Sequence, residues 1–121
     1  MKLKITERGW IGHFICGPEC RFRRNTLVEN GRKKIVVSTV GQMYDSNNEL
    51  NTVGCDRYYE TMAFKAKWDG HYWDADVSKQ VYFGSKWSMG DFREGSDEEA
   101  NSMHEAVVQE ICKIITSKEV K

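Results

Sequence analysis

Two stretches of the chain alternate hydrophobic and polar positions around a glycine turn, which is the pattern of a β-hairpin. In the first, residues 21–29 and 32–40 flank Asn30-Gly31, a dipeptide that strongly favours a two-residue turn. A turn at this position pairs Thr26 with Ile35 and puts alternate side chains on the same face. That face is predicted to carry one arginine among apolar neighbours, namely Phe22, Arg24, Thr26, Val28, Ile35 and Val37.

In the second stretch, residues 58–68 and 71–77 flank Asp69-Gly70, again predicted as a two-residue turn. The alternation predicts one face packed on the core and one face in water. The predicted apolar pairs are Met62 with Val77, Phe64 with Ala75, and Ala66 with Trp73.

The pattern then changes to helical spacing near the C-terminus. Ser96-Asp97-Glu98-Glu99 is a capping box, and it predicts a helix that runs to about Ser117. Residues 80–83 are predicted as a further short strand, and the polar residues 44–54 as a loop that covers a ligand. The apolar stripe expected to pack on the sheet consists of Ala100, Met103, Val107, Val108, Ile111, Ile114 and Ile115.

These elements predict an α+β fold, with an antiparallel sheet of about five to six strands backed by a C-terminal α-helix. The composition favours one folded domain over residues 1–121, because 40% of the residues are hydrophobic, 12% are aromatic and Pro18 is the single proline. The chain contains no repeat, linker or low-complexity stretch.

Charge and targeting signals narrow the possible partners. Lysine plus arginine and aspartate plus glutamate number 18 each, so an anion-binding surface must come from local clustering, which disfavours a general DNA-coating protein. No apolar run approaches the roughly 20 residues needed to cross a bilayer. Residues 1–7 lack the apolar core of a signal peptide, so we expect the protein to remain in the cytoplasm where it is made.

The four cysteines are expected to be free, mostly buried thiols, because no secretory signal accompanies them. The spacing of His13, Cys16 and Cys20, with Cys55 as a fourth ligand, is an alternative that would make a zinc site. We favour no metal, since structural zinc sites usually show two close ligand pairs and this chain shows one loose pair.

The densest cationic cluster is Arg21, Arg23 and Arg24 with Asn25. Arginine forks suit phosphate oxygens, and the neighbouring Phe22 is suited to stacking on a base or ribose. Arg24, on the apolar face, needs an acid, a carbonyl oxygen or a bound anion as partner, because an unpaired buried charge is destabilising. Arg32, Lys33 and Lys34 lie near the tip of the same hairpin. Solvated strand edges are the competing interpretation, and we favour it for Lys33 and Lys34.

Aromatic residues gather in the second half of the chain and include Tyr72, Trp73, Tyr82, Phe83 and Trp87. Trp73 is best explained as a core residue, because its predicted partner Ala66 lies on the apolar face. Phe83 and Trp87 have no such place, and a glycine-rich neighbourhood lets a ligand approach, so we predict that they stack on a base.

Signals of catalysis are weak. The chain has no nucleophile elbow, Walker loop, dinucleotide fingerprint or zinc-protease helix motif. An acid–base pair could be assembled from the histidines His13, His71 and His104 and from Asp74 and Asp76, which alternate on one strand, but spacing alone does not place it.

Two segments resemble a family of small bacteriophage proteins, the first type of Thoeris anti-defence sponge. The first segment is residues 7–16 continuing to 20–27, with Gly9-Trp10-Ile11-Gly12-His13 and Cys20-Arg21-Phe22-Arg23-Arg24-Asn25. The second is residues 35–41 with residues 56–62, including Val37-Ser38-Thr39-Val40-Gly41 and Asp56-Arg57-Tyr58-Tyr59-Glu60. The resemblance covers most of the chain.

The resemblance implies a non-enzymatic protein of the infected bacterial cytoplasm that captures a cyclic ADP-ribose isomer and so blocks host defence. It further implies a homo-oligomer, a dimer or higher such as a hexamer, and in some relatives the capture of cyclic oligonucleotides. We also expect no cofactor, no metal, no membrane and no long nucleic acid as partners. The matching positions that chemistry also favours are Arg21, Arg23, Arg24, Asn25 and Arg57 for phosphate, and Phe83 and Trp87 for stacking.

Two other functions remain open from the sequence. A small phosphodiesterase or glycohydrolase would destroy the same signal with His13 or His71 as acid or base. A single-stranded nucleic-acid or protein-binding module would use the strand from Arg21 to Arg24, and it would show strongly salt-dependent binding to oligonucleotides.

Overall fold

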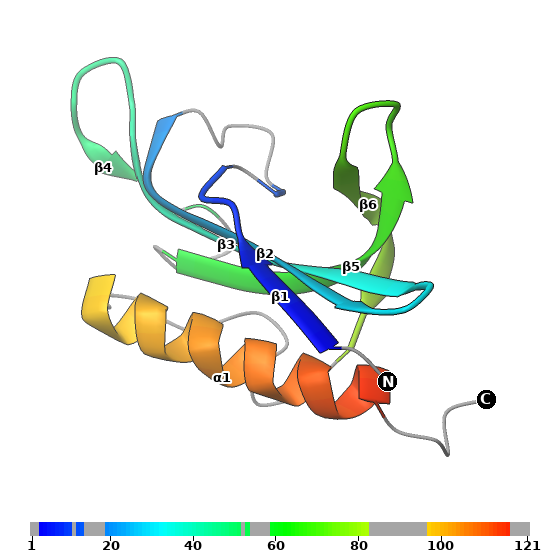
Figure 1. The fold of residues 1–121 in the computed structure, drawn as a ribbon. Helices are drawn as coiled ribbons and strands as arrows, with labels where there is room; N and C mark the ends of the chain where they lie inside the picture. The colour runs from blue at the N-terminus through cyan, green and yellow to red at the C-terminus, as the bar shows by residue number, and fades with distance from the viewer. Residues whose placement is uncertain are drawn as a thin grey trace.

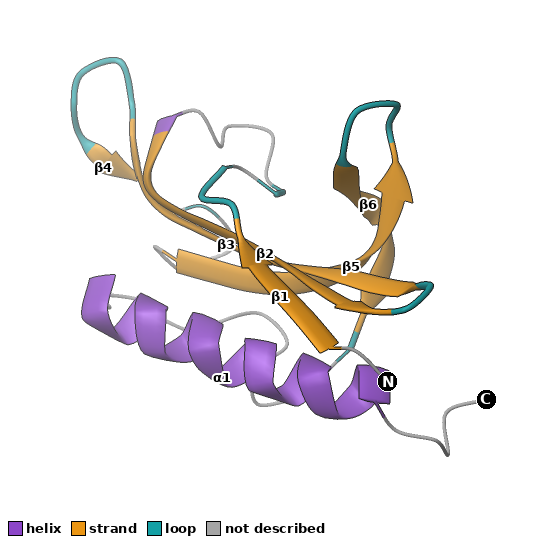
Figure 2. Cartoon of the chain, viewed as in Figure 1, coloured by secondary structure: helices purple, strands orange, loops and turns teal. Residues whose placement is uncertain are grey.

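The computed structural model describes residues 3–10, 12–13, 19–51, 53, 59–82 and 97–116. It contains a six-stranded antiparallel sheet and one C-terminal helix, which confirms the predicted α+β fold (Figure 1, Figure 2). The elements are β1 (Leu3–Glu7), β2 (Cys20–Asn30), β3 (Lys33–Tyr44), β4 (Leu50–Asn51), β5 (Tyr59–Trp68), β6 (Trp73–Val81) and α1 (Asp97–Thr116).

The strands follow the order β1-β2-β3-β5-β6, and the short β4 pairs with the end of β3. Strand β1, which the sequence analysis did not predict, forms one edge of the sheet beside β2. Figure 1 shows α1 lying along one face of the sheet, while the hairpin of β5 and β6 rises away from the other face. The described helix is not long and apolar enough to span a membrane.

The first hairpin forms, but its predicted register is wrong by two residues. Thr26 pairs with Val37 and not with Ile35, because the two turn residues are Gly31 and Arg32. Gly31 has a φ of 64°, a positive value that glycine adopts without strain at the first central position of such a turn. A shift of two residues leaves every side chain on its predicted face, since the strand period is two.

The second hairpin departs further from prediction. Four residues, 69–72, connect the strands, so Ala66 pairs with Ala75 and not with Trp73. The register then shifts between Phe64 and Ala66, and Phe64 pairs with Gln80. Residues 80–81 therefore complete β6 and do not form a separate strand, while Phe83 lies outside the described residues.

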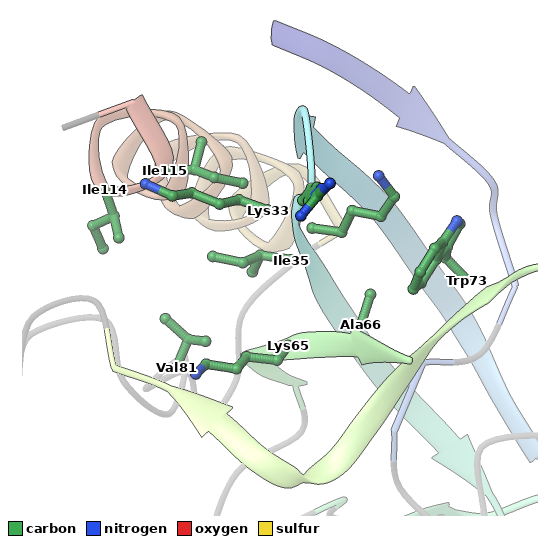
Figure 3. A pocket seen from close by; sticks show the side chains of 10 residues that line it. Lys33, Ile35, Lys65, Ala66, Trp73, Val81, Ile114 and Ile115 are labelled. Atoms are coloured by element: carbon green, nitrogen blue, oxygen red, sulfur yellow. The ribbon is translucent and has the colours of Figure 1, made fainter. Parts of the chain in front are cut away.

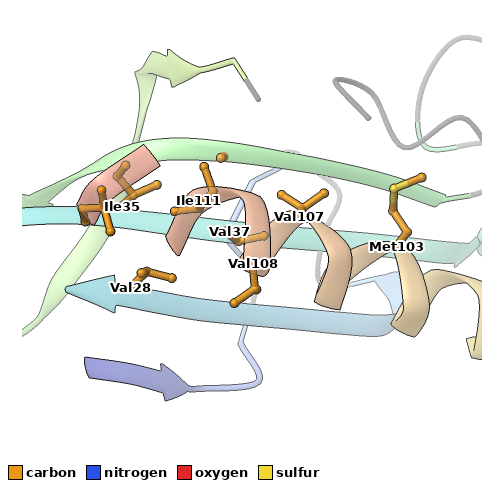
Figure 4. Close-up of a cluster of buried hydrophobic side chains, with 9 residues drawn as sticks. Val28, Ile35, Val37, Met103, Val107, Val108 and Ile111 are labelled. Carbon is orange, nitrogen blue, oxygen red and sulfur yellow. The ribbon is translucent and has the colours of Figure 1, made fainter. Parts of the chain in front are cut away.

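The core lies between α1 and the sheet (Figure 4). The helix begins and ends within a residue of the predicted limits, as far as the described range extends. Its predicted stripe is confirmed: Ala100, Met103, Val107, Val108, Ile111 and Ile115 are buried, and Ile114 is half-buried. Ala100 packs with Phe22 and Tyr59, and the other side chains pack on Val28, Ile35, Val37 and Ala63 of the sheet.

A line of hydrogen bonds crosses this core through His104, which has no exposed surface. The hydroxyl of Thr26 donates to Glu7 Oε1 at 2.7 Å and therefore accepts from His104 Nε2 at 2.7 Å. Thr39 Oγ1 lies 2.7 Å from Nδ1 and 2.7 Å from Thr61 Oγ1. The contact with Thr26 places a proton of His104 on Nε2, and a neutral ring then accepts a hydrogen bond from Thr39 at Nδ1.

Burial, reinforced by the positive charge of Arg24, lowers the pKa of His104 from 6.5 to about 3. Between these values the unfolded chain binds a proton that the folded protein does not, so stability falls as the pH drops below 6.5. We expect the free energy of unfolding to be about 2 kcal/mol lower at pH 5 than at pH 7 from this group alone, measured by urea denaturation. The His104→Gln variant should be less stable at pH 7 but should lose most of this pH dependence. An unchanged dependence in the variant would contradict the assignment.

Candidate ligand-binding site

The predicted arginine strand is divided between the two faces of the sheet. Arg24 lies on the helix face, where its guanidinium contacts Glu7 Oε1 and Glu105 Oε2, each at 2.6 Å. Burial lowers the pKa of Arg24, but hydrogen bonds to the two carboxylates outweigh this effect, so the pKa is raised. The sequence left an acid, a carbonyl oxygen or a bound anion as possible partners of Arg24, and the structure shows that two acids are the partners.

The other members of the predicted cluster lie on the opposite face, and each has a different environment. Arg21 stacks over the ring of Tyr44 at 3.8 Å and donates to Asn48 Oδ1 at 3.1 Å, which ties β2 to the loop after β3. Arg23 is exposed and has no recorded partner in the described part of the chain. Asn25 is fully buried. Phe22, proposed for stacking, lies instead on the helix face, where it is buried against the ring of Tyr59 and packs with Ala100.

Asn25 holds the segment that follows β1 against the sheet. Its Oδ1 accepts hydrogen bonds from Arg8 Nε at 2.9 Å and Arg8 Nη2 at 2.6 Å. Arg8 Nη1 donates to the backbone carbonyl of Trp73, so one guanidinium joins β2 to β6. Asn25 Nδ2 has no partner among the described residues. Asn25 therefore acts as a structural anchor in this arrangement.

Three predicted ligand residues, Arg57, Phe83 and Trp87, lie outside the described residues. The same holds for Cys16 and Cys55, two of the four ligands of the alternative zinc site. No group of three or more histidine, cysteine, aspartate or glutamate side chains suited to a metal occurs within the described ranges.

His13, a candidate for acid–base chemistry, lies in a buried polar cluster. Its Nδ1 is 2.7 Å from Ser38 Oγ, and its Nε2 is 3.0 Å from Glu60 Oε1. These are the residue types of a serine-histidine-acid triad, but Ser38 has no exposed surface. Gly12 lies so close that an added Cβ would be 2.5 Å from Ser38 Oγ. The Ser38 hydroxyl is thus closed to solvent in this structure, and the cluster anchors residues 12–13 to the sheet.

A cavity of about 480 Å³ opens where β5 separates from β3 (Figure 3). The two strands pair from Gly41 and Tyr59 as far as Ile35 and Lys65, after which β5 turns away with β6. We call this the fork cavity. Its described lining consists of Arg32, Lys33, Lys34, Ile35, Lys65, Ala66, Trp73, Val81, Ile114 and Ile115.

The fork cavity has an aliphatic wall, an aromatic wall and a cationic rim. Figure 3 shows Ile35, Ile114 and Ile115 near the end of the helix, with Trp73 on the far side. Lys33 extends from β3 towards the helix, and Lys65 lies near Val81. No acidic side chain occurs among the described lining residues.

Only part of the cationic rim already has partners. Lys34 Nζ donates to the Gly31 carbonyl at 2.7 Å, lies 3.5 Å from Glu29 Oε2 and sits 5.1 Å from the centre of a Trp73 ring. Within the described residues, Arg32, Lys33 and Lys65 have no recorded ion pair or hydrogen bond. These positive charges interact favourably with the partial negative charge at the C-terminus of α1. They can also bind an anion.

Trp73 is half-buried and packs against the cluster that contains Phe64 and Ala75, so part of its predicted role in the core is met. The same ring also lines the cavity and lies 5.4 Å from the ring of Trp68, which is 56% exposed.

From the sequence, Lys33 and Lys34 were interpreted as residues of a solvated strand edge, and Lys65 was not singled out. The alternation of residues gave no signal of where the pairing of β3 and β5 ends.

The fold and the cavity define an α+β protein with a cation-rimmed apolar site at the end of its sheet. Comparison of the chain with protein-family models, with curated proteins and with solved structures gave no match.

Arg24 and Arg23 form a matched pair for testing the two faces of β2. We expect Arg24→Ala to lower the free energy of unfolding by about 1.5 kcal/mol, because it removes hydrogen bonds to two carboxylates. Arg23→Ala should change it by less than about 0.5 kcal/mol, since the residue is exposed. Urea denaturation at pH 7 measures both, and equal stability of the two variants would rule out the structural role of Arg24.

Proposed function

We propose that this protein captures a small nucleotide signal, a cyclic ADP-ribose isomer, and sequesters it without cleaving it. The observation that carries the proposal is the fork cavity, which combines an apolar body with a rim of four cations and no acid among its described lining residues. A nucleotide has the complementary chemistry, because its base presents apolar faces and its phosphates carry negative charge. The cavity also falls within the usual size range of small-molecule sites.

The energetics of such a site suit sequestration. A protein that withholds a signal from its receptor needs nanomolar affinity, which corresponds to about −12 kcal/mol. Charge-assisted contacts from lysine and arginine to phosphate oxygens are among the stronger hydrogen bonds. Stacking on an aromatic ring such as Trp73 adds about 1–3 kcal/mol per base.

The chemistry of the lining favours binding over catalysis. Apart from three lysines, the described lining residues include none of the usual general acids, bases and nucleophiles, since no histidine, carboxylate, hydroxyl or thiol is among them. His13 is committed to a buried cluster, and His71 lies exposed in the turn between β5 and β6. A hydrolase would need reactive groups from other parts of the chain.

The proposal includes a homo-oligomer in the cytoplasm of an infected bacterium. The edge strand β1 supports self-association, because its outer edge has no partner strand in the described sheet. Ile5 pairs with Val28, so it lies on the helix-facing side of the sheet, and it is 48% exposed. Leu3, at 44% exposed, continues this apolar strip.

Sequestration is tested by incubating the purified protein with cyclic ADP-ribose isomers, washing it, denaturing it and identifying what is released by chromatography and mass spectrometry. We expect intact ligand in stoichiometric amount. The double variant Lys33→Gln/Lys65→Gln should bind at least about tenfold more weakly, because it removes two charges of the rim.

The matched control for that variant is Lys79→Gln/Lys113→Gln, which removes the same charge from exposed residues that do not line the cavity. This control should bind like the wild type. A degraded product would make the protein an enzyme, and retention of no ligand by the wild type would refute the proposal.

Self-association is tested by light scattering after size-exclusion chromatography at micromolar concentration. We expect the wild type to elute as a dimer or larger species and Ile5→Lys to shift towards monomer, because the variant places a charge on the apolar edge. Val77→Lys changes an apolar residue on β6 that is more exposed, at 61% against 48% for Ile5, and serves as the control. A monomeric wild type would exclude the oligomer.

A further inference from the structure

We infer that two copies of the chain associate through β1, with the two β1 strands antiparallel across a twofold axis and Ile5 opposite Ile5 of the second copy. One continuous sheet then runs through both copies. This inference rests on the self-association that the proposed function includes, but it does not depend on the identity of the ligand.

The first observation is the direction of the backbone groups of β1. Arg8 N donates to the Asn25 carbonyl at 2.7 Å, so these residues form a hydrogen-bonded pair that continues the register of β1 and β2. Hydrogen-bonded and non-hydrogen-bonded pairs alternate along an antiparallel ladder. The N–H and C=O groups of Leu3, Ile5 and Glu7 therefore point away from β2, towards the outer edge of the sheet.

The second observation is the exposure of the same strand. Every residue of β1 is exposed except Thr6, which is half-buried. The helix α1 packs mainly on β2, β3 and β5, and it leaves Leu3 and Ile5 exposed by 44% and 48%. The outward backbone groups and the exposed apolar side chains thus belong to the same residues. A further strand added at this edge satisfies the first and covers the second.

The third observation is that the sequence of β1 can pair with itself. A twofold axis through Ile5 aligns all five residues of the strand with those of the second copy. It sets Leu3 opposite Glu7 and Lys4 opposite Thr6, and about six backbone hydrogen bonds form, since each hydrogen-bonded pair exchanges two. An axis through Lys4 would set two lysines opposite each other, which is destabilising, and would leave part of the strand unpaired. The strand therefore favours a second copy in this one register.

The opposite edge of the sheet explains why the association closes at this interface. Figure 1 shows β6 rising away from the sheet with β5. The Ser78 N–H of β6 already donates to Asp76 Oδ1 at 3.1 Å, and Lys79 is exposed beside it. Charged side chains on an edge strand discourage pairing. A contact of β1 with β6 of the next copy would build an open fibre, whereas β1 with β1 uses both edges and closes.

The inference is tested first by Ile5→Pro. The proline removes a backbone donor that points outward, so β1 can still pair with β2 as an edge strand. By light scattering after size-exclusion chromatography, we expect the folded variant to elute at no more than half the molar mass of the wild type. Ile5→Val keeps the donor and a branched apolar side chain, and it should elute like the wild type. Circular dichroism checks that each variant is folded.

The register is tested by single cysteines in a glutathione redox buffer. We expect Ile5→Cys to form a disulfide between copies, because the Cα atoms of such a pair lie about 5.5 Å apart, within the range of a disulfide. Leu3→Cys should cross-link at least about tenfold more slowly, because the two cysteines would lie several residues apart along the paired strands. The wild type, which has four cysteines, gives the background.

The outcomes separate this inference from the proposed function. A folded Ile5→Pro that elutes like the wild type, or faster cross-linking through Leu3→Cys than through Ile5→Cys, would overturn the inference and leave the oligomer standing. Should Ile5→Pro fail to fold, the cysteine pair decides. A monomeric wild type would refute both the inference and the oligomer. A β1-paired dimer that retains no cyclic nucleotide would support the inference and refute the function.

Discussion

The fork cavity, and the arrangement of the two hairpins around it, depend on the point at which β3 and β5 stop pairing. Strand β3 pairs with β2 along almost its whole length, but with β5 only as far as Ile35 and Lys65. Beyond that point β5 turns away with β6, and the register shift between Phe64 and Ala66 makes this turn possible, since an irregularity of this kind bends the strand that contains it. The separation leaves an apolar space between the two hairpins, bordered by the last turn of α1, with lysines at its mouth.

Polar contacts on both faces keep this geometry in place. On the helix face, His104 links α1 to β2 and β3 through threonine hydroxyls, and Arg24 joins β2 to both β1 and α1. On the other face, Arg8 connects Asn25 on β2 with the backbone of Trp73 on β6. A hairpin held in this way presents a preformed wall to a ligand, which reduces the entropy lost on binding.

The local parts of this architecture could be predicted from the sequence, and the non-local parts could not. The capping box and the apolar stripe located α1, and alternation placed the side chains of β2 and β3 on the correct faces, because both signals come from neighbouring residues. It failed for the second hairpin, where Ala63 is fully buried on the face expected in water and Val77, expected to pack on the core, is 61% exposed. The register of the first hairpin was wrong by two because Asn30 is the last strand residue and not a turn residue. In the second hairpin the longer connection, residues 69–72, shifts the pairing by two, and the irregularity between Phe64 and Ala66 shifts it further, so that Phe64 pairs with Gln80 and not with Ala75. For the site, the arginine cluster of β2 was visible in the sequence, but three of its four members have structural partners. The role of Lys65 depends on the end of strand pairing, which no local pattern records.

We propose that a nucleotide occupies the fork cavity. The direct test is to titrate a cyclic ADP-ribose isomer into isotopically labelled protein and to follow the backbone amide and indole resonances. We expect the largest shifts on Trp73, Lys65 and residues 32–35, with small shifts at Arg21 and Arg23 at the other end of β2. Shifts confined to residues 20–24 and their surroundings, with Trp73 and Lys65 unchanged, would contradict it.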